Sequence, residues 1–375
     1  MATEVLSSEE ALVSQLADQL IAQHPPASTS AIAFLGAQFD AGLAWVHFPV
    51  GHGGLGLTPK FQKVVNEKIA RSGGPNSYAR NPIGYGMCGP TVVEWGTEEQ
   101  KRKYLRPLFT GEEIWCQLFS EPGSGSDFAG LSAKGVKDGD EWIVNGQKVW
   151  TTLAHLSKWG LLVVRTDAEA VKHAGLTAFV VDMHAPGVEV RPLRQITGEA
   201  EFNEVFFTNA RVPRDWVIGE VNDGWRAATG LLAHERSSLG KVGADEKREA
   251  NVSAAVPVHY LLDIAAKVGK NSDESIRQDL ARAYTGEKIM GWIGQRKAHP
   301  SIGKLWRTKQ ARFVASVAAQ LALSGAAAHE VGDKDGEFWM YHILNAPRMS
   351  LGGGTDEIQK NTIGERALGL PREPN

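Results

Sequence analysis

The sequence predicts an α+β fold in which an N-terminal helical domain, a central β domain and a C-terminal helical domain follow one another. Apolar residues recur at helical spacing at both ends of the chain, whereas residues 116–215 contain short runs of Val, Ile, Phe and Thr broken by Gly, Asp and Asn. Helices and strands do not alternate, which argues against a Rossmann cofactor domain. We therefore expect domains at residues 1–115, 116–217 and 218–375.

Composition excludes several classes of function. The 375 residues exceed what one hydrophobic core normally holds, and the 40 basic and 43 acidic side chains nearly cancel, leaving a net charge of −3. This balance gives no reason to expect nucleic acid or an anionic membrane as a partner. No metal site is predicted.

Cysteine content and the N-terminus bear on the cellular compartment. Cys88 and Cys116 are too few for a disulfide framework and are expected to be buried thiols. The N-terminus lacks a basic region followed by an apolar run, and the apolar stretches are too short to span a bilayer. We therefore expect a cytoplasmic protein without a membrane span.

Helical patterns fill the N-terminal part of the chain. A helix is expected to begin at Ser7–Glu10 and to stop at Pro25-Pro26. The glycine-rich segment Phe48–Gly56 does not predict a nucleotide site, because no strand precedes it and the P-loop lysine is missing. Thr97 and Glu98 are typical of a helix cap followed by an acidic first turn. The remaining helices are expected at residues 31–41, 58–71 and 97–110.

The β domain shows strand patterns separated by turns. Asp138-Gly139 and Asn145-Gly146 are typical of hairpin turns, with a strand at Trp142–Val144 between them. Val212-Pro213 is expected to end the last strand. Further strands are expected at residues 159–165, 176–182 and 188–192.

The helical period returns near residue 225 and continues almost to the end of the chain. Residues 241–255 are polar and lack strong periodicity, so they are expected to form a loop or an irregular helix. The C-terminal helices are expected at residues 225–240, 256–268, 273–297, 302–328, 334–349 and 355–368.

The stretch Cys116–Asp127 holds the strongest candidate for a ligand site. It begins as an apolar strand, breaks at Pro122 and continues as a loop of Gly, Ser and Asp. Glycines let backbone N–H groups approach an anion closely and serine hydroxyls add donors, a combination that suits a pyrophosphate. The same composition is also typical of an ordinary surface turn, so the loop alone decides nothing.

Four ordered motifs together resemble the acyl-CoA dehydrogenase family over most of the chain. They are Ser120–Asp127, Trp150–Thr152, Phe202–Pro213 and Gly352–Gln359. The resemblance implies an α-β-α architecture with a central β-barrel or sandwich and a C-terminal four-helix bundle. It also implies an FAD enzyme that dehydrogenates an acyl-CoA thioester to the trans-2-enoyl-CoA and passes the electrons to an electron-transfer flavoprotein.

The resemblance also implies roles for individual residues. Gln117, Phe119 and Ser120 would lie along the pyrimidine edge of the flavin, partly through backbone groups, and Ser126 near the pyrophosphate and the substrate. Trp150, near the route for electrons leaving, would face the flavin. The other implied contacts are Thr152 with the flavin, Thr355 and Glu357 with the phosphates and adenine end of FAD, and Arg236 and Gly353 with the substrate.

The catalytic base is not where many family members have it. In those members a Glu precedes the Gly-Thr of the C-terminal motif, and this chain has Gly353 there. Long-chain and isovaleryl types instead have a base on the helix after the β domain, immediately before an arginine, and a small residue at the loop position. Glu235, followed by Arg236, matches that arrangement, whereas a surface position is expected for His234.

One departure bears on oligomeric state. Most homotetrameric members have an Arg-x-x-Phe-Gly stretch that reaches the neighbouring subunit's FAD, and Lys241–Arg248 lacks it. The adenine end of FAD would then be bound differently, or completed by a different subunit. This divergence resembles an actinobacterial branch of the family that handles bulky substrates. We therefore expect either a homotetramer or an α2β2 heterotetramer with a related subunit.

Two other readings remain open from the sequence. The same fold serves flavin oxidases and monooxygenases, but their hydroxylating members have no need of a carboxylate at Glu235. Gly353 and the missing Arg-x-x-Phe-Gly stretch also fit a non-catalytic partner subunit of a heterotetrameric acyl-CoA dehydrogenase.

Overall fold

The computed structural model describes residues 8–240, 256–296, 298–322, 330 and 332–372. The chain forms two compact units. The first combines Met1–Leu193 with Ala200–His234, and the second combines Arg194–Glu199 with Glu235–Asn375.

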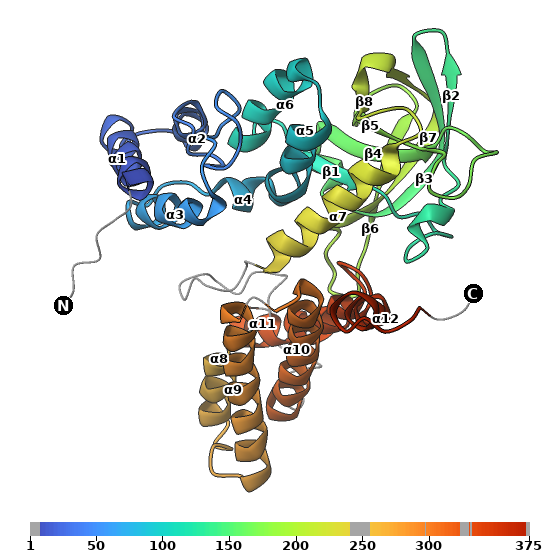
Figure 1. The fold of residues 1–375 in the computed structure, drawn as a ribbon. Coiled ribbons are helices and arrows are strands. Elements are labelled where there is room, and N and C mark those ends of the chain that lie inside the picture. The colour runs from blue at the N-terminus through green and yellow to red at the C-terminus, as the bar shows by residue number, and fades with distance from the viewer. Residues whose placement is uncertain (1–7, 241–255, 297, 323–329, 331, 373–375) are drawn as a thin grey trace. The chain divides into compact units, whose positions relative to one another are not determined.

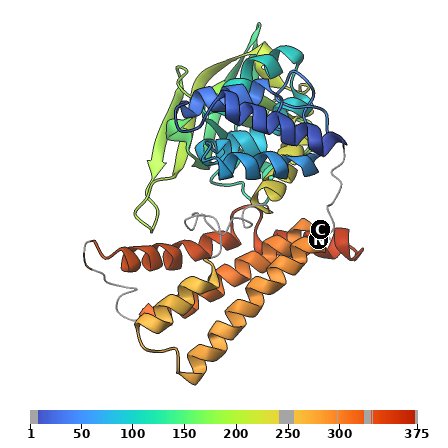
Figure 2. The same cartoon turned by 90° about the vertical axis from the view of Figure 1, so that its left-hand side faces the viewer.

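Short helices form the N-terminal part of the first unit and lie on one side of its sheet (Figures 1 and 2). The helices expected from residue 7 and at residues 31–41, 58–71 and 97–110 correspond to α1, α2, α3 and α6. Helix α3 follows a 3-10 turn at Pro59–Phe61. The sequence analysis missed α4, α5 and the π-helical turn Gly84–Cys88 between them. All three are short, and the turn and α5 contain Gly or Pro. The helices are α1 (Ser8–Gln23), α2 (Ala31–Asp40), α3 (Gln62–Arg71), α4 (Ser77–Arg80), α5 (Gly89–Trp95) and α6 (Glu98–Thr110).

Helix α6 begins with the predicted cap. The Thr97 hydroxyl accepts from the Gln100 N–H at 3.2 Å, and the Gln100 side chain accepts from the Thr97 N–H at 2.9 Å. The Gln100 amide also donates to the carbonyls of Asp215 and Val217, both at 2.8 Å. One residue therefore caps α6 and fixes it to the end of the sheet.

Removing the cap hydroxyl should destabilise the protein measurably. Thr97→Val keeps the shape of the side chain but cannot accept from the Gln100 N–H, so we expect a loss of about 1 kcal/mol in the free energy of unfolding. Urea denaturation measures it. Thr97→Ser retains the hydroxyl and should remain within a few tenths of a kcal/mol of wild type; an equal loss in both variants would contradict a capping role.

One mixed sheet makes up the β part of the first unit. Its strands run in the order β6-β7-β3-β2-β4-β5-β8, and β1 pairs in parallel with β4. β4 and β5 have the predicted bounds, and a short strand follows the expected end at Pro213. The strands are β1 (Trp115–Leu118), β2 (Lys134–Asp138), β3 (Glu141–Thr152), β4 (Trp159–Arg165), β5 (Leu176–Asp182), β6 (Val188–Leu193), β7 (Phe202–Pro213) and β8 (Val217–Ile218).

The second predicted hairpin turn, at Asn145-Gly146, is wrong. β3 continues through these residues and pairs with β7 on both sides of them, with a shift of register between Val144 and Gly146. Gly146 has φ +145°, and a Cβ there would lie 2.5 Å from the Cβ of Ala133. The glycine therefore marks a β-bulge with a close approach to the chain before β2.

Two hydrophobic cores meet at β4 and β5. Leu161 and Val163 lie on one face of β4 and pack with the N-terminal helices, because they share a buried cluster with residues of α5 and α6. Leu162 and Val164 point to the other face and pack with residues of β3 and β7. The sheet thus folds over itself as in a sandwich, with helices covering the outer face of β4 and β5.

Helix α7 (Gly224–Gly240) starts against this sheet. A Cβ on Gly224 would lie 2.6 Å from the backbone N of Ala178 in β5, so the helix can begin this close to the strand only with glycine. Ala227, Ala228 and Leu231 then bury one face of α7 in the core that contains the N-terminal helices.

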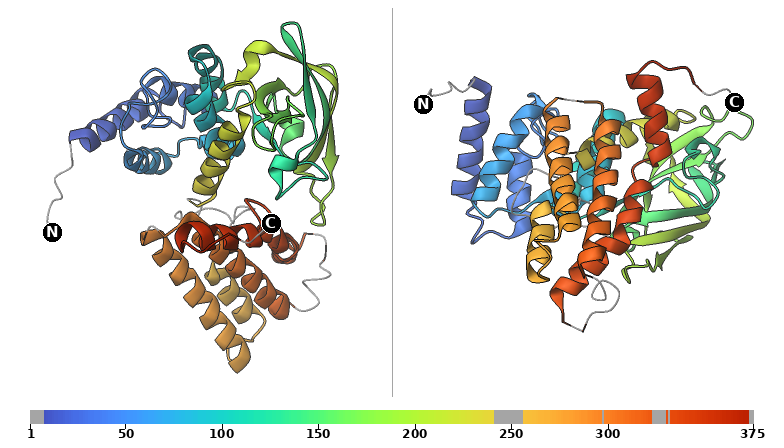
Figure 3. Two further views of the ribbon diagram at one scale, coloured as in Figure 1. Left: turned by 45° about the vertical axis from the view of Figure 1, so that its right-hand side comes forward. Right: turned by 90° about the horizontal axis from the view of Figure 1, so that it is seen from below.

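The second unit is a bundle of helices around its own core (Figure 3). α10 packs against α8, α9 and α11, and also against α12 at the start of the C-terminal segment. A helix is present in each predicted range, although residues 297 and 323–328 of those ranges lie outside the described residues. The range 334–349 ends in a 3-10 turn at Ala346–Ser350, and α12 is followed by a π-helical turn at Ile363–Ala367. The predicted irregular region 241–255 lies outside the described residues. The helices are α8 (Val258–Lys267), α9 (Glu274–Gln295), α10 (Pro300–Ala322), α11 (Lys334–Asn345) and α12 (Asp356–Thr362).

Both cysteines are buried free thiols, as expected. Burial raises the pKa of Cys116 to about 12 and also raises that of Cys88, so neither thiol is reactive at neutral pH. Within the described ranges, no helix is both long and apolar enough to cross a membrane.

Candidate active site

The structure brings the two motifs of the β domain together. The Val149 N–H donates to the Ser120 carbonyl at 2.8 Å, which joins β3 to the segment after β1. Phe119 is buried and stacks on Phe128 with ring centroids 4.9 Å apart. Ser120 therefore lies directly beside the segment that continues to Trp150 and Thr152.

Trp150 occupies an unusual backbone conformation. Its φ is +60°, a left-handed value that is strained for a bulky residue, and it lies at a shift of register between Lys148 and Thr151. This bulge leaves the Trp150 side chain 62% exposed while Thr151 is buried. The Trp150 ring meets Phe202 edge to face at 6.1 Å.

A buried ion pair that the sequence analysis missed lies beneath these motifs. The Lys148 ammonium donates to the Glu121 carboxylate at 2.8 Å and to the Phe119 carbonyl at 3.0 Å. The other acceptor positions of Glu121 are taken by the Ser132 N–H and hydroxyl and by the Ala133 N–H, at 2.7 to 3.0 Å. Both charged groups are thus paired and hydrogen-bonded inside the protein.

The surroundings keep both members of this pair charged at neutral pH. Burial by itself raises the pKa of Glu121, but the Lys148 charge and the Ser132 and Ala133 N–H groups outweigh it and hold that pKa below 4.5. Burial lowers the pKa of Lys148 to about 8 against the attraction of Glu121. Lys148 therefore remains protonated at pH 7.

This arrangement makes stability depend on Glu121 in acid. Because the folded-state pKa of Glu121 lies below its unfolded value, its stabilising contribution is present above about pH 4.5 and is lost as the pH falls through the folded-state pKa. Glu121→Gln has no carboxyl to titrate. We expect the difference in unfolding free energy between wild type and this variant to narrow across that range in urea titrations at several pH values. A difference that stays constant below pH 4.5 would contradict the assignment.

The first unit offers uncommitted polar groups around this region. Within the described residues, the side chains of Gln117, Ser120, Ser126 and Thr152 make no hydrogen bond, and all but the exposed Ser126 are half-buried. Gln117 lies on β1, and Ser126 lies in the loop closed by the Ser124 hydroxyl bonding the Asp127 carbonyl at 2.6 Å. Free donors beside a rigid backbone fit the polar edge and phosphates of FAD.

Helix α7 carries the candidate base on an unusual face. Glu235 follows Ala228 and Leu231 at helical spacing, so it continues the stripe that is buried further up the helix, and it is itself half-buried. A carboxylate on the apolar side of a helix is a candidate for chemistry rather than solvation. Arg236 is the next residue of α7; its side chain lies outside what the structure describes.

His234 is not the surface residue that the sequence analysis expected. Its side chain is 26% exposed, and Nε2 lies 3.0 Å from a carboxylate oxygen of Glu94 on α5, an ion-pair contact without hydrogen-bond geometry. The indole N–H of Trp95, next to Glu94, is buried and has no hydrogen-bond partner in the described part of the chain. Polar groups of α5 therefore lie next to His234, the residue that precedes Glu235 in α7.

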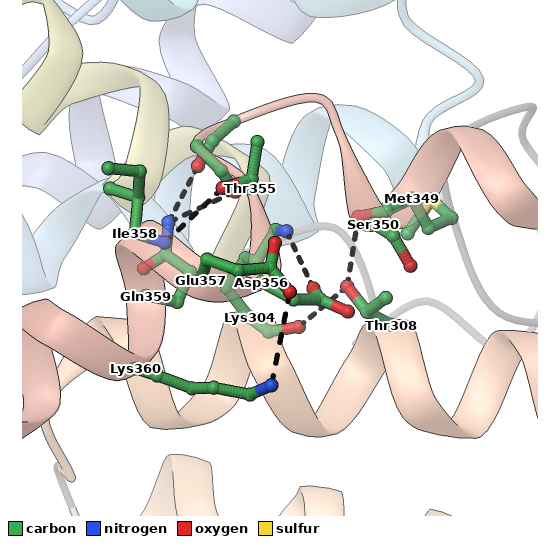
Figure 4. Close-up of polar contacts among 12 residues, drawn as sticks. Lys304, Thr308, Met349, Ser350, Thr355, Asp356, Glu357, Ile358, Gln359 and Lys360 are labelled. Atoms are coloured by element: carbon green, nitrogen blue, oxygen red, sulfur yellow. Dashed lines mark hydrogen bonds and ion pairs between the residues drawn. The ribbon is translucent and has the colours of Figure 1, made fainter. Parts of the chain in front are cut away.

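The remaining candidates form a group in the second unit at the start of α12 (Figure 4). Thr355 caps α12 by accepting from the Ile358 N–H at 3.2 Å, and Glu357 lies 3.9 Å from Lys360 on the exposed side. Asp356 pairs with Lys304 of α10 at 3.3 Å. These contacts fix the first turn of α12 onto α10.

The glycine loop before α12 is held by a buried glutamine. Gln359 donates to the carbonyls of Gly353 and Gly354 at 2.8 and 3.3 Å. Gly353 and Gly354 have φ +69° and +83°. A glutamate at position 353 would therefore be strained, so the base position used by other family members is disfavoured here by the backbone as well as by the residue type.

Sequence reasoning found the loop residues but not the groups that hold them. Lys148 and Glu121 are 27 residues apart, and no local pattern links them. The segment Lys241–Arg248, which lacks the Arg-x-x-Phe-Gly stretch, lies outside the described residues.

Two family models match the N-terminal and middle parts of the chain. Residues 12–112 match the model for the N-terminal domain of acyl-CoA dehydrogenase. Residues 116–210 match the model for its middle domain.

Individual relatives extend the likeness to most of the chain. Acyl-CoA dehydrogenase IpdE1 of Mycobacterium tuberculosis is 38% identical over 346 residues, covering 89% of this chain and 86% of its own. Two solved structures, each 24% identical, share the fold along 100% of both chains: the Tcur3481-Tcur3483 steroid ACAD, with a TM-score of 0.74, and the ChsE4-ChsE5 complex from Mycobacterium tuberculosis, with a TM-score of 0.72.

Proposed function

The chain belongs to the acyl-CoA dehydrogenase family of oxidoreductases, and on this premise we propose that it dehydrogenates an acyl-CoA thioester to the trans-2-enoyl-CoA with bound FAD. An electron-transfer flavoprotein would accept the electrons. The observation that carries this proposal is the half-buried Glu235 on the apolar stripe of α7, combined with Gly353 where other members have their base.

The polar groups of the first unit would bind the cofactor. When bound, FAD would accept the hydride that leaves the β carbon of the substrate. Gln117 and Ser120, together with the backbone of Phe119, would contact the pyrimidine edge, and Ser126 the pyrophosphate. Thr152 and Trp150 would face the ring, and Thr355 and Glu357 would contact the phosphates and adenine end. The uncommitted hydrogen-bonding capacity of these side chains in the first unit supports these assignments.

Glu235 would act as the general base. Its carboxylate would take the proton from the α carbon, across the substrate from the acceptor. The backbone N–H at Gly353 would donate to the thioester carbonyl and stabilise the negative charge that develops as the proton leaves. Arg236 and Ser126 would bind polar or phosphate groups of the CoA moiety.

The described structural relatives bear on the kind of acyl group and on the assembly. One structural relative is described as a steroid ACAD and another as a complex of two differently named chains. We propose a bulky, branched or ring-bearing acyl group, and assembly as a homotetramer or as an α2β2 heterotetramer with a related subunit. Turnover of straight medium-chain esters alone would contradict the substrate part of this proposal.

The visible spectrum of the purified chain tests the proposed function. We expect a yellow protein whose flavin absorption bleaches under anaerobic conditions when a steroid side-chain or branched acyl-CoA is added, because substrate electrons then reside on the cofactor. Straight-chain esters serve as the comparison. A colourless protein that turns yellow only with a partner chain would instead favour the non-catalytic subunit, and FAD that no acyl-CoA reduces would contradict the dehydrogenase assignment.

A further inference from the structure

The buried pair Lys148–Glu121 joins two segments that are far apart in sequence. Lys148 is fully buried in β3, and its ammonium bonds both the Phe119 carbonyl and the Glu121 carboxylate. Ser120 lies between these two bonded residues. A single side chain of β3 therefore bonds the backbone of the residue before Ser120 and the side chain of the residue after it.

Glu121 extends the connection to the next part of the chain. Its carboxylate accepts from Ser132 and Ala133, directly before β2, and its own N–H and carbonyl exchange hydrogen bonds with Ser124 at 2.9 and 3.0 Å. These backbone bonds close the turn Glu121–Ser124 at the start of the loop, and the carboxylate holds that turn against the segment before β2.

The strained residue Trp150 follows this junction. A left-handed conformation in a bulky residue persists only where its surroundings hold it. The holding contacts are the Lys148 bonds and the Val149–Ser120 backbone bond before it, and the Asn203 amide that donates to the Thr151 carbonyl at 3.0 Å after it. Loss of the Lys148 contacts would remove the side-chain bonds on the side before the bulge and leave only backbone bonds to hold that side.

We propose that Lys148 and Glu121 are positioning residues for FAD, which together hold Ser120 and the segment Trp150–Thr152 in the arrangement that binds the flavin. This inference rests on the proposed FAD-dependent function. Neither residue needs to touch the cofactor, since Lys148 acts through the Phe119 carbonyl and Glu121 acts through the N–H groups of Ser132 and Ala133. If the ion pair served only to balance charge, FAD affinity would not depend on these backbone contacts.

A double variant separates positioning from charge balance. Lys148→Met leaves the Glu121 carboxylate buried without its counter-ion, so this single variant loses both stability and FAD. Lys148→Met/Glu121→Gln removes both charges and keeps similar volumes, so its urea midpoint should recover toward wild type. The Phe119 carbonyl still lacks its donor in the double variant, so its FAD affinity should not recover.

The measurements are made on the FAD-bound protein. Flavin fluorescence on serial dilution gives the dissociation constant of FAD, and we expect it to rise about 10- to 100-fold in the double variant, the range found when groups that orient metal ligands are removed. Lys158→Met is the matched control, because it removes another lysine–carboxylate pair of the same sheet, Lys158–Asp182, that is partly exposed. That control should retain FAD as wild type does.

Three results would overturn the inference. One is wild-type FAD affinity in the double variant, which would mean that Lys148 and Glu121 only balance each other's charge and do not position the FAD site. Another is an equal loss of FAD in Lys158→Met, which would make the effect a general one of the domain. The third is a wild-type chain that binds no FAD, which would overturn the proposed function as well and is thereby distinguished from the first two.

Discussion

Replacing Glu235 by glutamine is expected to slow anaerobic flavin reduction by acyl-CoA about 10²–10⁴-fold, because an amide cannot accept the proton from the α carbon. Shape and polarity at the position are retained, so the affinities for FAD and acyl-CoA should change little. Stopped-flow absorbance of the bound flavin measures the rate of reduction, and a substrate titration of the flavin spectrum measures acyl-CoA affinity.

Glu94→Gln provides the matched control. It makes the same chemical change on α5, at a carboxylate 3.0 Å from the His234 side chain next to Glu235. A base at Glu235 predicts less than a tenfold effect in the control, well below the range for losing general-base catalysis. A comparable loss in both variants would assign the effect to the polar surroundings of α7, and near-normal reduction in Glu235→Gln would place the base elsewhere.

Lys148→Met is expected to lower the free energy of unfolding by about 3–5 kcal/mol, because it leaves the Glu121 carboxylate buried without its counter-ion. Urea denaturation followed by tryptophan fluorescence measures the change. The Lys158–Asp182 pair has side chains 38% and 22% exposed, so Lys158→Met should cost less than about 1 kcal/mol. Equal costs for the two lysines would mean that burial of the Lys148 pair contributes little.

The parts of the fold that depend on local pattern could be predicted. β4 and β5 have the predicted bounds because their apolar runs are continuous and end at polar residues. The capped start of α6 was equally predictable, since Thr97 and the acidic first turn are local signals. The short α5 was not, because seven residues beginning with Gly-Pro do not establish a helical period.

The candidate site was predictable only in its loops. Motif order identified Ser120, Ser126 and Trp150. A lysine is normally exposed, and the ion pair that allows Lys148 to lie in the core is with Glu121, 27 residues away. The contact of His234 with Glu94 joins residues of two helices that are distant in the chain, and their packing decides it. Tertiary contacts of this kind have no signature in a single sequence.

The position of β4 and β5 between two cores has a consequence for how the protein unfolds. One face of these strands supports the N-terminal helices and α7, and the other supports β3 and β7. Unfolding of either core would expose apolar side chains of β4 and β5, and the other core is built on the same strands. The helical and β parts of the first unit should therefore behave as one cooperative foldon. The boundary between the two family models, at residues 112 and 116, divides the sequence but not this folding unit. We therefore expect that neither part folds as an independent module.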